Sequence, residues 1–331
     1  MSMDITNIIE KIKRTVDSHK LAEGEYARYL WQDENNTRKM GLNEYGVADA
    51  ANILYTIGEF ERDPEKRACW VKTLRAFQDK ETGLFQEPTH HFIHTTAHCI
   101  AALELFDALP EYPLTELLKY KEKEELYGLL DNLDWENLPW PQSHQGAGIY
   151  AAMTVSETVD AEWRQWYFDW LWDNADPETG FWKKGVERKA PLYTYMGGGF
   201  HYFFNIENGR MPVRYPEKII DSCIDMYEKN EIVPRFGKMI GFLEIDWAYC
   251  INRSIRQTTH RFDECKEILR KFAKDFIAYL NDIDEEKDDK FNDLHMLFGA
   301  TCALAELQAA LPGEIISPKP LRLVLDRRPF I

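Results

Sequence analysis

The segment HTTAHCIAALEL, residues 94–105, decides the fold, because segments of the same kind return about every fifty residues. Each segment opens with a polar or aromatic cluster and continues as a helical stretch of small residues. A period of this length is typical of repeated supersecondary units. The other five segments are NEYGVADAANIL from Asn43, SHQGAGIYAAM from Ser143, YTYMGGGFHYFF from Tyr193, LEIDWAYCINR from Leu243 and NDLHMLFGATCALAEL from Asn292.

A second kind of helical stretch, longer and more charged, lies between these segments. Examples begin at Asp63, Val159 and His260. In the stretch from Val159, bulky apolar residues follow i, i+3, i+4 and i+7 spacing, which predicts one buried face and one face in water. We therefore expect charged outer helices, and inner helices whose Ala, Gly and Cys residues allow close approach on several sides.

Counting from a first outer helix at Ile5–Ser18, outer and inner helices alternate up to a twelfth that ends near Ala310. This pattern predicts an all-α fold, an (α/α)6 toroid of six inner and six outer helices, forming a single domain over residues 1–311. An open helical solenoid is the alternative, although its repeats are shorter. Residues 312–331 contain Pro318 and Pro320, which block a helix, so we expect an extended C-terminal strap packed on the barrel.

Composition narrows the possible partners. The 331 residues are 44% hydrophobic and carry a formal net charge of −16, which favours one large core and works against nucleic acid or an anionic membrane as partner. We find no signal peptide, no apolar stretch of membrane-spanning length and no CxxC pair among six cysteines. The expectation is a cytoplasmic protein with a small-molecule or oligosaccharide substrate; its oligomeric state stays open.

Polar residues gather where the inner helices begin, and seven of the nine histidines fall in these segments or just before them. In a closed ring these helix starts would line one mouth of a central funnel, where free amide groups favour anionic or hydroxyl-rich ligands. The predicted catalytic residues are Glu244, Asp246, Asp49, Glu44, Asp293, His94, His98, His144, His201 and His295. The predicted substrate-binding residues are Tyr45, Gln145, Trp140, Trp182, Tyr193, Tyr195 and Trp247.

Each of these residues also has a structural interpretation. Asn43, Ser143 and Asn292 stand where helix N-caps would, and Asp49 and His98 suit hydrogen bonding between helices. His94 and His98 have the i, i+4 spacing of a zinc pair, but the Glu of an HExxH motif is missing, so we predict neither a metal nor another cofactor. Histidines beside carboxylates fit proton transfer better.

Two loops, FQDKETGLF at 77–85 and DNADPETGFW at 173–182, share an acidic residue followed by Glu-Thr-Gly. This pattern resembles the turns of six-hairpin glycosidases and, more distantly, of terpenoid cyclase and protein prenyltransferase toroids, which implies the toroid fold across nearly the whole chain. We expect Gly83 and Gly180 to supply the left-handed C-cap of an outer helix. The chain departs from these relatives: it lacks the DxDD acid of the cyclases and the Cys-His-Gly zinc motif of lanthionine cyclases, and Asp246 with Cys250 does not reproduce the prenyltransferase zinc set.

The first functional hypothesis is a carbohydrate-active enzyme, a glycoside hydrolase or related lyase acting on a short oligosaccharide. Hydrolysis needs two carboxyl groups, for which Glu244 or Asp246 would face Asp49, Glu44 or Asp293. Aromatic residues such as Trp140 and Tyr195 would stack on sugar rings. The alternatives are a sugar epimerase or isomerase of the N-acylglucosamine 2-epimerase type that uses histidines, a non-catalytic toroid that binds glycan or protein, and a terpenoid cyclase-like enzyme.

Overall fold

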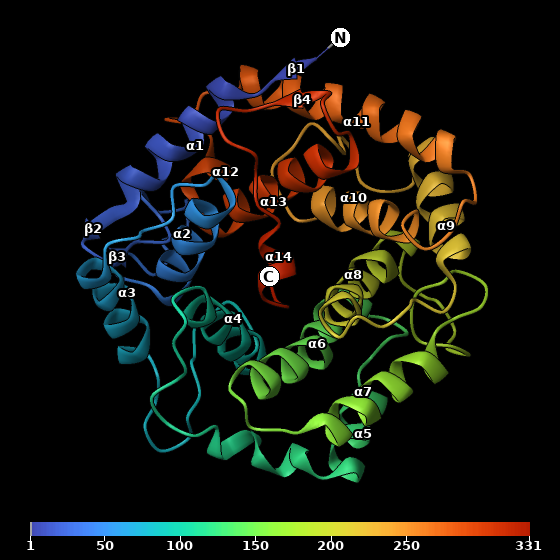
Figure 1. The fold of residues 1–331 in the computed structure, drawn as a ribbon, viewed down its shortest axis with the longest axis horizontal. Helices are drawn as coiled ribbons and strands as arrows, with labels where there is room; N and C mark the ends of the chain where they lie inside the picture. Colours follow the sequence, from blue (N-terminus) through green and yellow to red (C-terminus); the bar gives the residue numbers. More distant parts are fainter. Residues whose placement is uncertain (1) are drawn as a thin grey trace.

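The computed structural model describes residues 2–331, and over this range the chain is mainly helical, as the sequence predicts. Long helices alternate between the rim and the interior (Figure 1). The rim holds α1 (Thr6–His19), α3 (Pro64–Ala76), α5 (Lys123–Asp131), α7 (Ala161–Asn174), α9 (Pro216–Glu228) and α11 (Phe262–Asp282). The interior holds α2 (Glu44–Thr56), α4 (Phe92–Leu105), α6 (Pro139–Val155), α8 (Leu192–Asn208), α10 (Leu243–Ser254) and α13 (Leu294–Ala310).

Short elements connect or cover these helices. The strand β1 (Met3–Asp4) pairs in parallel with β4 (Ile315–Ile316), and β2 (Lys20–Ala22) pairs antiparallel with β3 (Glu25–Tyr26). The remaining short helices are the 3-10 helix η1 (Thr115–Lys121), α12 (Asp289–Asn292) and α14 (Val324–Arg327). Among the described residues, no helix combines the length and the apolar character needed to cross a membrane.

The contacts between neighbouring inner helices form a closed series that begins and ends at α2. Helix α2 packs against α4, α4 against α6, α6 against α8, α8 against α10, α10 against α13, and α13 against α2. Contacts join similar positions on neighbouring helices: Tyr45 meets His94 near the helix starts, and Arg253 meets Glu306 near the ends. Neighbouring inner helices therefore run in the same direction, and their N-termini lie at the same end of the molecule.

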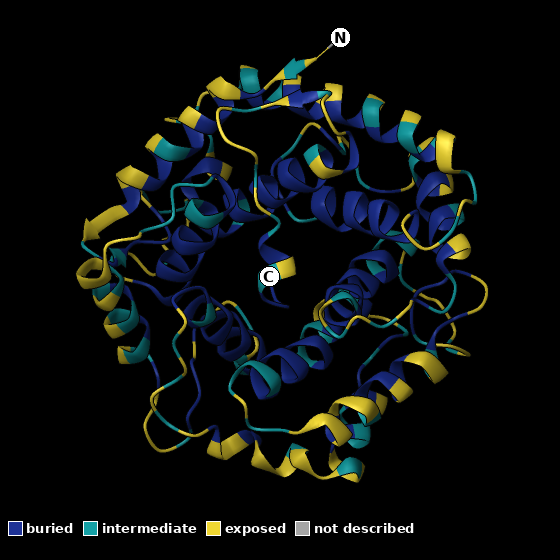
Figure 2. Cartoon of the chain, in the orientation of Figure 1, coloured by how far each residue is buried: buried dark blue, intermediate teal, exposed yellow. Residues whose placement is uncertain are grey.

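Burial differs between the two sets of helices as their composition requires. The inner helices are buried almost all round, whereas the outer helices expose one face (Figure 2). In α7, Trp163 and Tyr167 are buried while Arg164 and Gln165 are exposed. Small residues allow the close inner packing: a Cβ on Gly146 would lie 2.2 Å from the hydroxyl of Tyr202 on α8.

The two Glu-Thr-Gly loops are tight turns, but their glycines are not helix caps. Gly83 and Gly180 have positive φ angles of 76° and 82°, so the predicted left-handed conformation is confirmed. The predicted C-cap position is wrong, because α3 already ends at Ala76 and α7 at Asn174. The Asp79 carboxylate accepts the amides of Glu81 and Thr82, which closes a separate turn beyond the helix.

The C-terminal segment ends in the middle of the ring of inner helices (Figure 1). After β4, the backbone amide of Arg322 bonds to the carbonyl of Thr56 at the end of α2. Two ion pairs then fix α14: Asp326 bonds Arg253 of α10 at 2.7 Å, and Arg327 bonds Asp107, just after α4, at 2.9 Å. Residues 328–331 follow and are buried. The segment therefore enters the centre at the end of the molecule where the inner helices have their C-termini.

Replacing Gly83 by alanine tests how tightly the first turn packs. Its Cβ would lie 2.0 Å from the carbonyl oxygen of Pro113, and its φ is left-handed. We expect Gly83→Ala to lower the free energy of unfolding by about 3 kcal/mol or more, from backbone strain plus the clash. Gly185 is the matched control, because its φ is 78° and no atom lies within 4 Å of a Cβ there.

Gly185→Ala carries the backbone strain alone, so we expect a loss of about 1–2 kcal/mol. Urea unfolding of both variants measures the difference. Equal losses would show that the turn at Gly83 has room to move away from Pro113.

Candidate active site

Six histidines form a connected group of rings near the starts of the inner helices; we call it the histidine cluster. Its members come from α4, α6, α8, α13 and the residue run just before α4, and they are His90, His94, His98, His144, His201 and His295. Ring centroids lie 4.5 Å apart for His94 and His144, and 4.2 Å for His144 and His201. The remaining close pairs are His90–His94 at 4.6 Å, His90–His295 at 5.1 Å and His98–His295 at 5.4 Å. The ring of inner helices thus gathers residues that are two hundred positions apart in the sequence.

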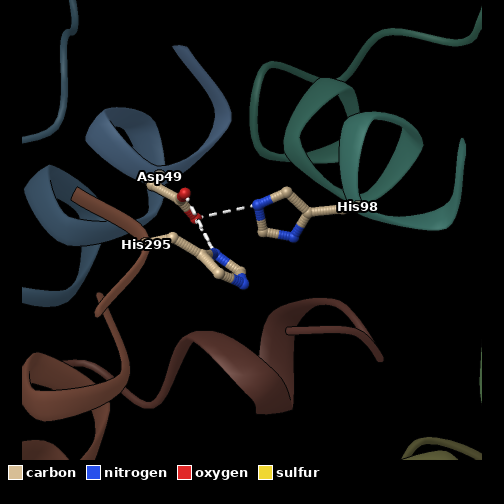
Figure 3. Close-up of side chains that lie close together, drawn as sticks. All are labelled: Asp49, His98 and His295. Atoms are coloured by element: carbon tan, nitrogen blue, oxygen red, sulfur yellow. Dashed lines mark hydrogen bonds and ion pairs between the residues drawn. The ribbon is translucent and has the colours of Figure 1, made fainter. Parts of the chain in front are cut away.

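Asp49 holds two members of the cluster (Figure 3). One carboxylate oxygen lies 2.8 Å from Nε2 of His98, and the other lies 3.1 Å from Nδ1 of His295. Burial alone raises the pKa of Asp49, but the facing imidazoles of His295 and His98 lower it more, so it stays ionised. An ionised carboxylate only accepts hydrogen bonds, so both rings donate to it. His295 therefore keeps an unprotonated Nε2, and His98 an unprotonated Nδ1.

His201 is held in a defined tautomer by Ser143. The Ser143 hydroxyl donates its one proton to the carbonyl of Trp140 at 2.8 Å. Nδ1 of His201 lies 2.8 Å from the same hydroxyl oxygen, so this nitrogen donates and Nε2 is left unprotonated. In both His295 and His201, a hydrogen bond on Nδ1 leaves Nε2 available to accept a proton.

Two further hydrogen bonds hold His94 and His90 in the cluster. The Tyr45 hydroxyl lies 2.6 Å from Nδ1 of His94. Nδ1 of His90 lies 2.7 Å from the hydroxyl oxygen of Thr89, whose own proton goes to Glu87. Tyr45 also contacts four cluster rings, stacking on His90, His94 and His98 and meeting His295 edge-on. Tyr45 is therefore part of the cluster's wall.

Burial lowers the pKa of five members of the cluster, His94, His98, His144, His201 and His295. It lowers the pKa of His295 to about 4 and that of His201 to about 3. For His94 and His144, burial and the neighbouring imidazoles lower the pKa well below the usual value. Neutral imidazoles with an unprotonated nitrogen accept protons, so the cluster has the groups needed for general base chemistry.

Asp293 and Glu44, two of the predicted catalytic carboxylates, have basic partners. Asp293 makes a two-point ion pair with Arg28, at 2.8 and 3.1 Å, and also caps α13 by accepting the amide of His295. Glu44 lies 3.1 Å from the ammonium group of Lys39. Pairing of this kind serves to hold loops onto the inner helices.

Glu244 and Asp246 lie together in the first turn of α10. Burial raises the pKa of Glu244 to about 7; burial and the Glu244 carboxyl raise that of Asp246 well above its usual range. Glu244 accepts the amide of Gly237 at 3.2 Å, whereas neither oxygen of Asp246 has a partner among residues 2–331. Asp246 approaches α8 where Gly197 leaves space, beside Trp140. The pair can donate a proton to a ligand.

The predicted stacking residues separate into two groups. Trp140 and Tyr193 are half-buried, at the starts of α6 and α8. Trp182, Tyr195 and Trp247 are fully buried and donate to the backbone carbonyls of Leu171, Glu136 and Cys223 respectively. Gln145 bonds Gln142 and lines a shallow cavity beside α5. Only Trp140 and Tyr193 of this set combine an aromatic ring with partial exposure.

The predicted N-caps are right in one case out of three. Asn43 caps α2 by accepting the amide of Tyr45 at 2.8 Å. Ser143 lies inside α6, which already begins at Pro139, and holds His201 instead. Asn292 accepts the amides of Leu30 and Trp31, while the neighbouring Asp293 caps α13. Both errors arise because the helix starts differ from the repeat markers by a few residues.

Three residues near the cluster escaped the sequence prediction. Arg28 belongs to a loop outside the repeated segments, and Arg328 and Phe330 belong to the C-terminal segment. The ring of Phe330 meets that of His94 edge-on, at 4.9 Å between centroids. Nothing in the repeat points to these positions, because only the path of the folded chain brings them to the centre.

Asp49, His98 and His295 also form the set best suited to a metal ion. Their ligand atoms all lie within 4.8 Å of one another, and two imidazoles with one carboxylate suit a transition metal. In the structure the same atoms are joined by hydrogen bonds, which a metal would replace (Figure 3).

Only part of the cluster is exposed. None of five surface cavities of the described chain has a histidine in its lining. One of these five, about 670 Å³, lies between α9 and α11. His90 and His144 are half-buried, as is Phe242, whose ring lies 4.6 Å from that of His295. These side chains are the exposed edge of the cluster.

Comparison of the chain with protein-family models, with curated proteins and with solved structures found no match in any of the three. The functional argument therefore rests on the geometry of this chain.

The buried neutral histidines predict a loss of stability in mild acid. Their pKa values are lower in the folded than in the unfolded chain, where histidine titrates near 6.5, so stability is complete above that pH. As the pH falls from about 6.5 towards 4, the histidines bind protons in the unfolded chain but not in the folded chain, so the free energy of unfolding decreases. Each such histidine contributes a slope of about 1.4 kcal/mol per pH unit. Urea unfolding at a series of pH values measures it.

His201→Asn removes one of these groups and should flatten the slope by about one histidine's share. His19→Asn offers a comparison outside the cluster, because burial also lowers the pKa of His19 to about 4. A free energy of unfolding that does not change between pH 6.5 and 4 would contradict the neutral, buried state of the cluster.

Proposed function

We propose that the protein is an (α/α)6 toroid enzyme that moves protons on a small carbohydrate, as a sugar epimerase or isomerase does. The observation that carries this proposal is His295, held by Asp49 with its Nε2 unprotonated, within the histidine cluster. The toroid assignment is supported by the inner-helix contacts, which run from α2 to α13 and back to α2. Six free cysteines, five of them buried, suit a reducing compartment such as the cytoplasm.

The proposed chemistry begins with His295 taking a proton from a carbon next to a carbonyl group. The Nδ1–H bond to Asp49 orients the ring and stabilises the imidazolium that forms. The substrate becomes an enediol or enolate, and a protonated carboxyl at Asp246 or Glu244 is suited to supply a proton to its oxygen. Return of the proton from His295 to the neighbouring carbon, while the other enediol hydroxyl gives its proton back to the carboxylate, yields an isomer. An epimer results when a second imidazole, protonated beforehand from solvent, delivers its proton to the original carbon from the opposite face; His295 then releases the proton it took to solvent.

A carbohydrate substrate is supported by the groups at the exposed edge. Aromatic rings, of which Trp140 and Phe242 are half-buried, suit the C–H faces of a sugar, and imidazoles suit its hydroxyl groups. Since the exposed part of the cluster consists of half-buried side chains such as His90 and His144, a monosaccharide is favoured over a long chain.

Glycoside hydrolysis or elimination is the second candidate, because Glu244 has the raised pKa of a general acid. It needs an ionised carboxylate as partner. Asp49, Glu44 and Asp293 already have histidine, lysine or arginine partners, and burial beside Glu244 raises the pKa of Asp246 well above its usual range. Histidine-based proton transfer therefore ranks first.

Solvent exchange tests the proposal. The protein is incubated in D2O with a panel of aldoses, ketoses, N-acylhexosamines and uronic acids, and proton NMR follows the loss of a carbon-bound hydrogen and the appearance of an isomer. We expect exchange for at least one sugar. His295→Asn should slow it by about 10²- to 10⁴-fold, and Asp49→Asn by about a hundredfold or more, because the tautomer is lost.

His260→Asn is the matched control, since His260 also bonds an aspartate, Asp221 at 2.7 Å, but lies between α9 and α11 outside the cluster. Its exchange rate should equal that of the unmodified protein. New reducing ends without exchange, abolished by Glu244→Gln, would establish hydrolysis instead. An unsaturated product absorbing in the ultraviolet would establish elimination.

A further inference from the structure

Arg328 is a buried cation without a partner. Its side chain has no exposed surface, and within residues 2–331 none of its three guanidinium nitrogens has a hydrogen-bond acceptor. The two other fully buried arginines are paired: Arg28 with Asp293 at 2.8 Å, and Arg253 with Glu306 at 2.7 Å. The contrast matters because a buried charge is expensive unless an opposite charge compensates it.

The surroundings of Arg328 do not supply the missing acceptors. The guanidinium lies over the ring of Phe298, 5.4 Å from its centroid. Burial lowers the pKa of Arg328 to about 10, with Cys302 and Asp49 nearby, so the group is still protonated at neutral pH. Asp49 is not within ion-pair distance, and its oxygens already accept from His98 and His295. The guanidinium donors of Arg328 therefore have no acceptor. Nδ1 of the buried His98 also has no hydrogen-bond partner in the described chain.

The position of Arg328 is fixed on both sides. Asp326 and Arg327 before it are anchored to α10 and α4 by ion pairs, and the ring of Phe330 after it packs on His94 and Phe204. A flexible segment would turn an unpaired guanidinium towards water. This segment instead holds it against the inner side of the histidine cluster, at the C-terminal side of the helices, opposite the exposed edge.

We infer that Arg328 is an oxyanion receptor, which binds a carboxylate or phosphate group of the ligand whose carbon atoms lie among the histidines. The inference rests on the proposed function for its site and adds the substrate class: a sugar acid or a sugar phosphate. A guanidinium offers two parallel N–H donors to either group. Binding would compensate the buried charge. The unpaired arginine therefore lowers the stability of the ligand-free protein and serves ligand recognition.

Anion binding is measured with three probes: inorganic phosphate, D-glucuronate and the neutral D-glucose. Thermal unfolding and calorimetry of the full chain in a dilute chloride buffer report the effect of each. We expect phosphate or glucuronate, but not glucose at the same concentration, to raise the unfolding temperature. Arg328→Gln should weaken that anion's affinity by about ten- to a hundredfold. Glucuronate alone would identify a carboxylate, and phosphate alone a phosphate ester.

Two comparisons separate recognition from structure. Arg328→Met, measured without anion, should unfold at a higher temperature than the unmodified protein, because an unpaired buried charge is removed. Arg322→Gln changes an exposed arginine earlier in the same segment, whose backbone amide but not its side chain fixes the chain path, and should leave anion binding unchanged. An anion effect that survives Arg328→Gln, no anion effect at all, or a lower unfolding temperature for Arg328→Met would each overturn the inference.

The readout is binding, so it is independent of turnover. His295→Asn should keep the anion effect while it loses proton exchange. Retained anion binding without exchange on any sugar would refute the proposed function and leave the receptor standing. Proton exchange on a sugar that persists in Arg328→Gln with unchanged KM would refute the receptor and leave the proposed function standing.

Discussion

Close approach of the inner helices is the constraint on which the rest of the structure depends. Small residues at their contacts allow it: Gly146 faces Tyr202, Gly197 faces Trp140 and Asp246, and a Cβ on Gly299 would lie 2.8 Å from the carbonyl oxygen of Gly241. Larger side chains at these positions would push the helices apart. The starts of neighbouring helices would then separate, and the ring-to-ring contacts of the histidine cluster would be lost.

Burial and the presence or absence of a partner together set the charge of the ionisable groups Asp49, Glu244 and Asp246. Asp49 remains ionised because the imidazoles of His295 and His98 bond it, whereas Glu244 and Asp246 lack basic partners and have raised pKa values. Burial likewise disfavours the charged form of His94 and His201 and lowers their pKa values. At neutral pH this interior therefore contains both imidazoles with lowered pKa values and carboxyl groups with raised pKa values.

The C-terminal segment lies in the centre of the molecule, among the inner helices (Figure 1). The sequence led us to expect a strap on the barrel and an open funnel, but Arg328 and Phe330 are buried against the inner helices, and their neighbours include the rings of Phe298 and His94. A ligand that reaches the cluster from His90 and His144 would meet this segment on the far side. Its two ion-paired neighbours, Asp326 and Arg327, give the segment the fixed position that a binding residue requires.

The sequence by itself determined the helical class, the alternation of charged and small-residue helices, and the gathering of Asp49, His94, His98, His144, His201 and His295, because periodicity and composition are local properties that repeat with the chain. It could not determine which carboxylates are paired, where Trp182 and Trp247 point, or that Arg28 and Arg328 reach the same region. Those facts depend on contacts between residues far apart in the sequence, such as Arg28 with Asp293, which are 265 positions apart, and on the burial that results. The tertiary structure decided them, since a side chain's charge state and partners follow from its surroundings in space and not from its place in a repeat.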